Sequence, residues 1–178
     1  MPGKKILQEL TGEKVGWDEP VSDDQRRRWN EWKADMLNLE TMTTPRCYTP
    51  DGFGTPVSQT LHCFSDASSI GYGQVSYLRS VNADGEVHVC QVMAKSCVVP
   101  LKSVKIPRLQ LSAVTVSVKV GALLSDELDF SLLETVFWTD SSIVLGYICN
   151  KTKRFKIYVH ISILNALSTF ERGYGKVI

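Results

Sequence analysis

The stretches LHCFSDAS (residues 61–68) and TVFWTDSS (residues 135–142) decide the fold expected for this chain. Each is a short apolar run with the character of a β-strand, and each ends on an aspartate, Asp66 in the first and Asp140 in the second. An acidic residue at the end of an apolar run suits a metal site better than a core. If the fold brings the two strand ends together, the carboxylates supply the oxygen ligands that a hard divalent cation such as Mg²⁺ requires.

The sequence after residue 58 alternates between strand and helix patterns. The order βββ-α-β-α-α predicts a mixed α/β sheet, antiparallel at first and then crossing over to a strand parallel with the first. The Asn-Ala-Asp-Gly sequence at 82–85 predicts the hairpin turn between the second and third strands. No strand is expected after 134–139. The predicted strands are 60–66, 72–80, 86–95 and 134–139, and the predicted helices are 107–125, 141–149 and 155–170.

The segment 107–125 fits two patterns. Valines alternate along it (Val114, Val116, Val118 and Val120), which favours a strand. Its 19 residues exceed a typical strand, and Pro107 suits the first turn of a helix. Length and the helically spaced apolar set favour a helix.

Residues 1–58 predict a separate, smaller part of the chain. A short helix is expected at 4–16, and a second helix follows Ser22, which is a suitable N-cap residue. Residues 41–58 are rich in Thr, Pro and Gly and predict a connector. We therefore expect two domains, 1–58 and 59–178.

Composition excludes several classes of protein. The chain has 178 residues and is 43% hydrophobic and 22% charged, which is typical of globular domains. Its five cysteines are odd in number, without CxxC spacing, so neither a disulfide framework nor a structural zinc site is expected. No run of 18 apolar residues and no signal peptide is found, so we expect no membrane association and an intracellular location, cytoplasmic or nuclear.

The two aspartates have ordinary explanations as well as a chemical one. Asp140 precedes a predicted helix and is a possible N-cap, and Asp66 is a possible start of a turn. In the predicted topology, however, both lie at the carboxyl ends of neighbouring parallel strands, where ligands collect. Two carboxylates there repel each other unless a cation lies between them, which favours a metal site. A site with two metal ions can hold both the attacking water and the leaving oxygen in the hydrolysis of a phosphodiester.

Four motifs carry a family resemblance. FSDAS (64–68), YGQVSYLRS (72–80), AKSCVVPLKSVKIPRLQL (94–111) and FWTDSSIVLGYI (137–148) resemble the ribonuclease H domain of BEL/Pao-type retrotransposon polyproteins. Residues 5–21 and 26–48 similarly resemble the segment that joins reverse transcriptase to ribonuclease H in those polyproteins. The resemblance implies a ribonuclease H-like fold, a connection segment at 1–58 and parent polyprotein segments, reverse transcriptase and integrase, as partners.

The resemblance also implies a site and a reaction, the Mg²⁺-dependent (or Mn²⁺-dependent) cleavage of the RNA strand of an RNA–DNA hybrid. It maps Asp66 and Asp140 onto the first and third catalytic carboxylates. The second is a glutamate in a PRLEL-like motif, where this chain has PRLQL with Gln110. An amide keeps a carbonyl oxygen but brings no negative charge. The fourth carboxylate follows a fifth strand, and the chain ends at Ile178 before any such segment, so the domain is expected to be C-terminally incomplete.

Basic residues provide a possible contact with nucleic acid. Residues 1–60 carry 8 Lys and Arg against 10 Asp and Glu, and residues 61–178 carry 12 against 9, so the second part is mildly basic. Phosphate contacts from such residues are salt-dependent and independent of sequence; ordinary solvated side chains are the alternative. The candidate residues for binding a nucleic-acid backbone are Lys95, Lys102, Lys105, Arg108, Lys153 and Arg154.

Three functions are compatible with these features. The first is a metal-dependent nuclease, active or once active, that is a retrotransposon-derived ribonuclease H-like domain with cleavage expected to be impaired in this copy. The second is a non-catalytic nucleic-acid-binding fragment of a retroelement polyprotein, and the third is a structural remnant. The fold is common to all three and does not distinguish them.

Overall fold

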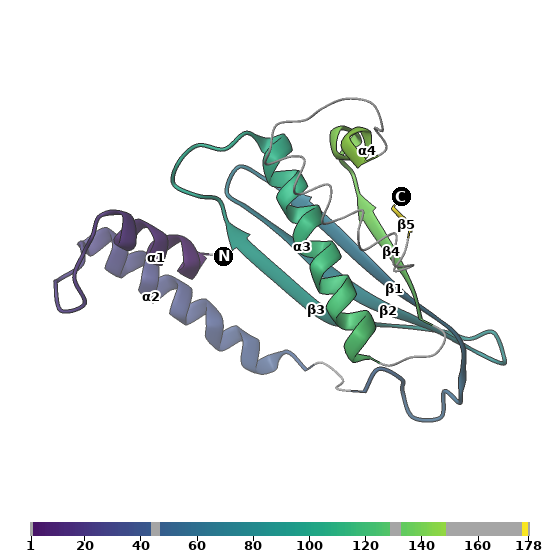
Figure 1. Ribbon diagram of the computed structural model, residues 1–178. Coiled ribbons are helices and arrows are strands. Elements are labelled where there is room, and N and C mark those ends of the chain that lie inside the picture. The colour runs from purple at the N-terminus through teal and green to yellow at the C-terminus, as the bar shows by residue number, and fades with distance from the viewer. Residues whose placement is uncertain (1, 44–46, 129–132, 149–175, 178) are drawn as a thin grey trace. The chain divides into compact units, whose positions relative to one another are not determined.

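The computed structural model of the chain describes residues 2–43, 47–128, 133–148 and 176–177 (Figure 1). It divides into two units. One unit comprises residues 1–46 together with Pro100–Ser103, and the other comprises residues 47–99 and 104–178. The first unit is helical, and the second is built around a β-sheet.

The first unit contains two α-helices, as the sequence predicts. Ser22 caps the second helix through a reciprocal pair of contacts with Gln25: the backbone N–H of Gln25 donates to Ser22 Oγ at 3.3 Å, and the backbone N–H of Ser22 donates to Gln25 Oε1 at 3.2 Å. This capping box satisfies two N–H groups that would otherwise lack partners. The elements are α1 (Pro2–Gly12), α2 (Asp23–Leu37) and the 3₁₀ helix η1 (Asn38–Thr41).

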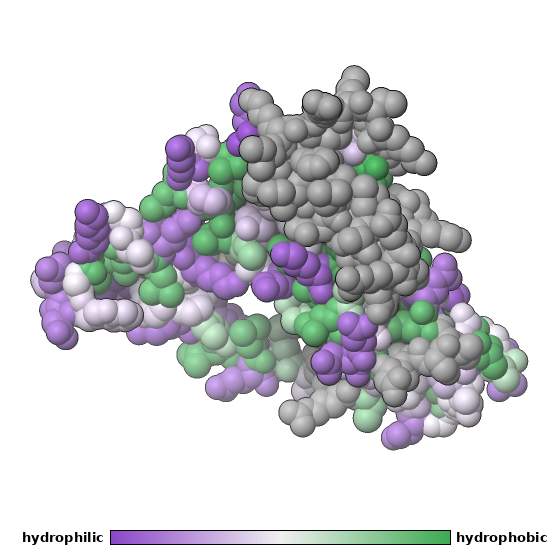
Figure 2. Space-filling view, viewed as in Figure 1, coloured by the Kyte–Doolittle hydropathy of each residue, from purple (hydrophilic) through white to green (hydrophobic). Residues whose placement is uncertain are grey.

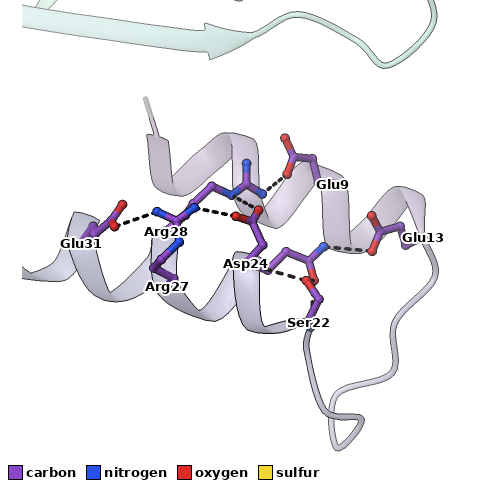
Figure 3. A network of polar contacts seen from close by, with 8 residues as sticks. Glu9, Glu13, Ser22, Asp24, Arg27, Arg28 and Glu31 are labelled. Atoms are coloured by element: carbon purple, nitrogen blue, oxygen red, sulfur yellow. Dashed lines mark hydrogen bonds and ion pairs between the residues drawn. The ribbon is translucent and has the colours of Figure 1, made fainter.

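Polar contacts join α1 to α2 (Figure 3). Arg28 of α2 forms an ion pair with Glu9 of α1, and Gln25 Nε2 donates at 2.9 Å to Oε2 of Glu13, the residue directly after α1. The Arg28 hydrogen bond lowers the pKa of Glu9 below its ordinary value of 4.5. Hydrophilic residues, purple in Figure 2, cover much of the visible surface of this unit, with apolar residues scattered among them.

In the part of the chain that the structure describes, five strands form one sheet in the order β3-β2-β1-β4-β5. β1 pairs antiparallel with β2, and β2 with β3, whereas β1 pairs in parallel with β4. The mixed sheet and the crossover predicted from the sequence are therefore confirmed. The strands are β1 (Pro56–Ala67), β2 (Gly71–Asn82), β3 (Val87–Val98), β4 (Leu133–Thr139) and β5 (Lys176–Val177).

The fifth strand corrects one expectation. The sequence predicts no strand after 134–139 and a domain that stops before a fifth strand, but β5 pairs in parallel with Val136 and Phe137 of β4. A strand of two residues leaves no alternating pattern in the sequence, which is why the prediction was wrong.

The hairpin between β2 and β3 turns where the Asn-Ala-Asp-Gly sequence predicts. Asn82 Oδ1 accepts the backbone N–H groups of Asp84 (3.1 Å) and Glu86 (2.8 Å). Gly85 has a φ of 80°, a conformation that side chains with a Cβ rarely adopt. The asparagine side chain and the glycine together fix the reversal of the chain.

The ambiguous segment is a helix, α3 (Ile106–Glu127), which lies across one face of the sheet (Figure 1). Its buried residues pack with Leu61 and Cys63 of β1 and Phe137 of β4. A Cβ at Gly121 would lie 2.7 Å from Phe137 ring atoms, so the absence of a side chain lets helix and sheet approach closely. Burial on one face of a 22-residue segment explains why the alternating valines do not form a strand.

A short helix, α4 (Ser142–Ile148), follows β4 and contributes the buried Val144 to the core. The helix predicted at 155–170 lies outside the described residues. Among the helices that the structure describes, none combines the length and the apolarity needed to cross a membrane.

Candidate active site at the carboxyl ends of β1 and β4

The two aspartates lie at adjacent strand ends. In the parallel pairing of β1 with β4, the last partners are Ser65 and Thr139, and each aspartate is the next residue along the chain, Asp66 within β1 and Asp140 directly after β4. Ser65 Oγ donates to the carbonyl oxygen of Trp138 at 3.1 Å, which ties the two strands together just before the aspartates. Neighbouring strands are about 4.8 Å apart, so Asp66 and Asp140 share one edge of the sheet.

Other residues fill the two structural roles that the sequence offered for the aspartates, which were helix N-cap for Asp140 and start of a turn for Asp66. Ser141 rather than Asp140 caps α4, because Ser141 Oγ accepts the N–H of Val144 at 3.3 Å. The turn after β1 is closed by Ser68, whose N–H donates to the Gly71 carbonyl at 2.8 Å. Both aspartates are exposed at the edge of the sheet.

The contacts of the two carboxylates differ. Asp66 Oδ1 accepts the backbone N–H of Ala67 at 2.6 Å, which holds one of its two oxygens. The Asp140 carboxylate has no hydrogen bond or ion pair with the residues that the structure describes. One carboxylate is partly fixed and the other is open to a ligand.

Gln110 reaches the same edge from α3. Its Oε1 accepts a hydrogen bond from Ser141 Oγ at 2.7 Å, and Ser141 directly follows Asp140. The side chain of Gln110 is half-buried and that of Ser141 is buried. Sequence reasoning did not single out Ser141; the signal was a serine at the first position after a strand and before a helix, the place of an N-cap.

Lys95 belongs to a row of directly paired residues that runs across β3, β2, β1 and β4 near the ends of β1 and β4. It pairs with Gln74, Gln74 pairs with Ser65, and Ser65 pairs with Thr139. Partners in one row point to the same face, so the exposed Lys95 lies two strands, or about 10 Å, from Ser65.

The other predicted backbone-binding residues fall in three places. Lys105 is the N-cap residue of α3, and Arg108 lies in its first turn; both are exposed. Lys102 lies in Pro100–Ser103, which belongs to the unit of α1 and α2. Lys153 and Arg154 are outside the described residues.

The oxygen atoms of Asp66 and Asp140 fit one hard divalent cation that is also bound by water or phosphate, rather than a metal ion enclosed by protein ligands alone. Among the described residues there is no group of three or more His, Cys, Asp and Glu side chains that could hold a metal ion. Mg²⁺ in proteins is often held by one or two carboxylates, with waters and substrate phosphates completing the shell. Asp66 and Asp140 match that arrangement, whereas Gln110 offers a neutral amide oxygen that already accepts the Ser141 hydroxyl.

Two titratable groups of β1 precede the site. The Cys63 thiol is buried, and burial raises its pKa to about 11, so this thiol stays protonated and serves as core. His62 lies on the opposite face, where its Nδ1 accepts the indole N–H of Trp138 at 3.0 Å. Burial, followed by the charge of Arg79, lowers the pKa of His62, which favours the neutral ring that this hydrogen bond needs.

The fold and the two strand-end aspartates together define the class. An antiparallel three-stranded sheet that crosses over through α3 to a parallel strand, with aspartates at the carboxyl ends of β1 and β4, is the ribonuclease H-like arrangement expected from the sequence. A sequence model of the family described as "Pao retrotransposon-like RNaseH-like domain" matches residues 1–141. This chain therefore belongs to that family.

Solved structures agree at the level of the fold. A foamy viral protease–reverse transcriptase in complex with double-stranded DNA is 15% identical, with a TM-score of 0.52. The alignment covers 98% of this chain but only 28% of the viral protein, so the chain corresponds to a part of that larger protein.

Two RNase H1 structures are matched over less of this chain. RNase H1 from the halophilic archaeon Halobacterium salinarum is 10% identical, with a TM-score of 0.43 over 67% of this chain and 83% of its own. LC11-RNase H1 in complex with an RNA/DNA hybrid is 6% identical, with a TM-score of 0.43 over 68% and 83%. No protein with a curated description matches this chain in sequence.

Proposed function

We propose that this chain is the ribonuclease H-like part of a retrotransposon polyprotein, that it binds the backbone of an RNA–DNA hybrid, and that cleavage of the RNA strand is impaired in it. The observation that carries the proposal is the pairing of Ser65 with Thr139, which leaves Asp66 and Asp140 side by side at one sheet edge. Membership of the Pao family supports the retrotransposon origin.

In this proposal Asp66 and Asp140 hold one Mg²⁺, or Mn²⁺ in its place, together with a phosphate of the nucleic acid. A divalent cation bound there would neutralise charge on the phosphate and lower the pKa of a bound water. The residues of the chain provide the negative charge, and the Ser65 contact with Trp138 holds the two strand ends in register.

Gln110 is the reason to expect impaired cleavage. A glutamate there would add a third negative charge and a third pair of carboxylate oxygens beside Asp140. The amide adds neither, and its only carbonyl oxygen accepts the Ser141 hydroxyl. Two-metal catalysis of phosphodiester hydrolysis needs ligands for both cations, and two aspartates with one neutral amide supply too little charge to hold them.

Basic residues at the same end of the sheet supply the proposed backbone contacts. Lys95 at the end of β3 and Lys105 at the start of α3 are exposed. Because such contacts release counterions from the nucleic acid, the affinity should fall steeply as salt is added. We propose further backbone contacts from Lys102, Arg108, Lys153 and Arg154.

A cleavage assay tests the proposal. A labelled RNA–DNA hybrid is incubated with the whole chain in Mg²⁺ and separately in Mn²⁺, beside the Asp66→Asn variant, and hybrid binding is measured at low salt. We expect salt-sensitive binding with negligible cleavage. Robust cleavage that disappears in Asp66→Asn would contradict the impairment. Absence of binding at low salt would contradict the nucleic-acid role and leave the structural remnant, the third of the functions compatible with the sequence; the missing carboxylate at Gln110 is the observation that favours it.

A further inference from the structure

The hydrogen bonds of Ser141 fix which end of the Gln110 amide faces it. Ser141 Oγ accepts the backbone N–H of Val144 at 3.3 Å, and it donates its own hydrogen to Gln110 Oε1 at 2.7 Å. Ser141 is only 5% exposed, so a hydroxyl hydrogen without an acceptor there would be costly. Turning the amide over would present N–H groups to the hydroxyl and remove its acceptor.

The other end of the amide is consequently left as a donor. Gln110 Nε2 carries two N–H groups, and neither has a hydrogen-bond partner within the part of the chain that the structure describes. The side chain is half-buried at the edge that carries Asp66 and Asp140. This end of the amide therefore offers hydrogen-bond donors at a place where a cation would require acceptors.

We propose that Gln110 Nε2 donates a hydrogen bond to a phosphate oxygen of the bound nucleic-acid backbone, and that Ser141 is the positioning residue that turns the amide for this contact. The inference rests on the proposed function, because it requires that the chain binds nucleic acid. An N–H donor next to Asp140 offsets part of the repulsion between that carboxylate and a phosphate without needing a cation.

This role reverses what a carboxylate at position 110 would do. Glutamate has almost the same shape as glutamine, but when ionised it only accepts hydrogen bonds and adds a negative charge. Without a divalent cation, Gln110→Glu should therefore repel the backbone. With a cation present the same carboxylate becomes a ligand, so the defect should shrink when Mg²⁺ is added.

The test measures hybrid affinity by fluorescence anisotropy in EDTA at low salt. A hydrogen bond to a charged group supports an expected loss of roughly tenfold in Gln110→Ala, and Gln110→Glu should lose more. Gln91→Glu, a change of an exposed residue on β3, introduces the same charge away from this edge and should stay within about twofold. Ser141→Ala, which leaves the amide present but unoriented, should lose about threefold.

A second readout separates a contact from a structural effect. In a ¹⁵N NMR titration with the hybrid in EDTA, the side-chain NH₂ signals of Gln110 should shift, whereas those of Gln91 should not. Equal affinities of Gln110→Glu and Gln91→Glu, or unshifted Gln110 signals, would overturn the inference while leaving the proposed function intact. If the wild-type chain shows no hybrid binding, both fail.

Discussion

Ser141 Oγ donates to Gln110 Oε1 at 2.7 Å, and this single hydrogen bond joins the start of α4 to α3 beside Asp140. The same hydroxyl caps α4 through the Val144 N–H. Ser141 therefore has two tasks, the local one of starting a helix and the tertiary one of orienting a residue of the candidate site. The Ser141 side chain is buried.

Ser141→Ala is expected to destabilise the sheet unit by roughly 1–3 kcal/mol, because it removes an N-cap and leaves the half-buried Gln110 carbonyl without its donor. The free energy of unfolding in urea measures the effect. The matched control is Ser142→Ala, a change of an exposed residue in the first turn of α4, which should stay within about 0.5 kcal/mol. Equal losses in the two variants would show that the hydrogen bond to Gln110 and the cap contribute nothing specific.

Two helical glycines should respond to alanine in opposite directions. At Gly121 of α3 a Cβ would meet the Phe137 ring at 2.7 Å and Cys63 Sγ at 3.3 Å, so Gly121→Ala should destabilise by about 1–3 kcal/mol. At Gly146 of α4 a Cβ would meet nothing within 4 Å, so Gly146→Ala should be neutral or stabilise by up to about 1 kcal/mol through helix propensity. Thermal unfolding followed by circular dichroism compares them. A stable Gly121→Ala variant would mean that α3 and β4 are not held this close.

The stability of the sheet unit should decrease as the pH falls below about 6.5, the ordinary pKa of histidine. Burial, first, and the charge of Arg79 lower the pKa of folded His62, with Glu134 acting in the other direction. The unfolded chain therefore takes up the proton first, which favours unfolding, and the protonated ring cannot accept the Trp138 N–H. Urea midpoints between pH 8 and 5 measure this. His62→Phe, which has no titratable ring, should lose less stability over that range; identical losses would refute the assignment.

The contact between α1 and α2 should depend on Arg28 more than on Arg27 (Figure 3). Arg28 pairs with Glu9 across the two helices. Within the described residues, Arg27 pairs with Asp24 and Glu31 of its own helix, and all three of these side chains are largely exposed. Arg28→Ala should lower the urea midpoint reported by tryptophan fluorescence, and Arg27→Ala should change it little.

Acid should reproduce the effect of the Arg28 change. The pKa of Glu9 is lowered by the Arg28 hydrogen bond, so its contribution is present above its ordinary pKa of 4.5 and is lost as the pH falls through the lower, folded value. An Arg28→Ala variant that keeps the wild-type midpoint, or one with an unchanged acid response, would contradict this account.

The sheet and its central helix were largely predictable because their signals are local. The apolar runs before Asp66 and Asp140 marked β1 and β4, and the Asn-Ala-Asp-Gly sequence at 82–85 marked the hairpin. Pro107 and the length of the segment outweighed the alternating valines, and burial of one face of α3 is the physical reason. The two residues of β5 are too few to carry a periodic signal, and the strand is recognised by its pairing with β4.

The site was predictable only in part, because register and side-chain contacts are tertiary properties. The sequence placed Asp66 and Asp140 at strand ends, but only the pairing of Ser65 with Thr139 makes them neighbours. Lys95 could be chosen for its charge, whereas its row with Gln74 and Ser65 depends on two separate strand pairings. The contact of Ser141 with Gln110 spans 31 positions of the chain and left no pattern in either segment.

The most direct test of the account is where Mn²⁺ binds. In ¹⁵N NMR spectra of the whole chain, added Mn²⁺ should broaden the backbone amide signals of Asp66, Ala67, Asp140 and Ser141 first. Both Asp66→Asn and Asp140→Asn should abolish that broadening, because in this account the two carboxylates hold one cation together. Broadening centred elsewhere, or broadening at this edge that survives either substitution, would contradict the claim that the ends of β1 and β4 form one cation site.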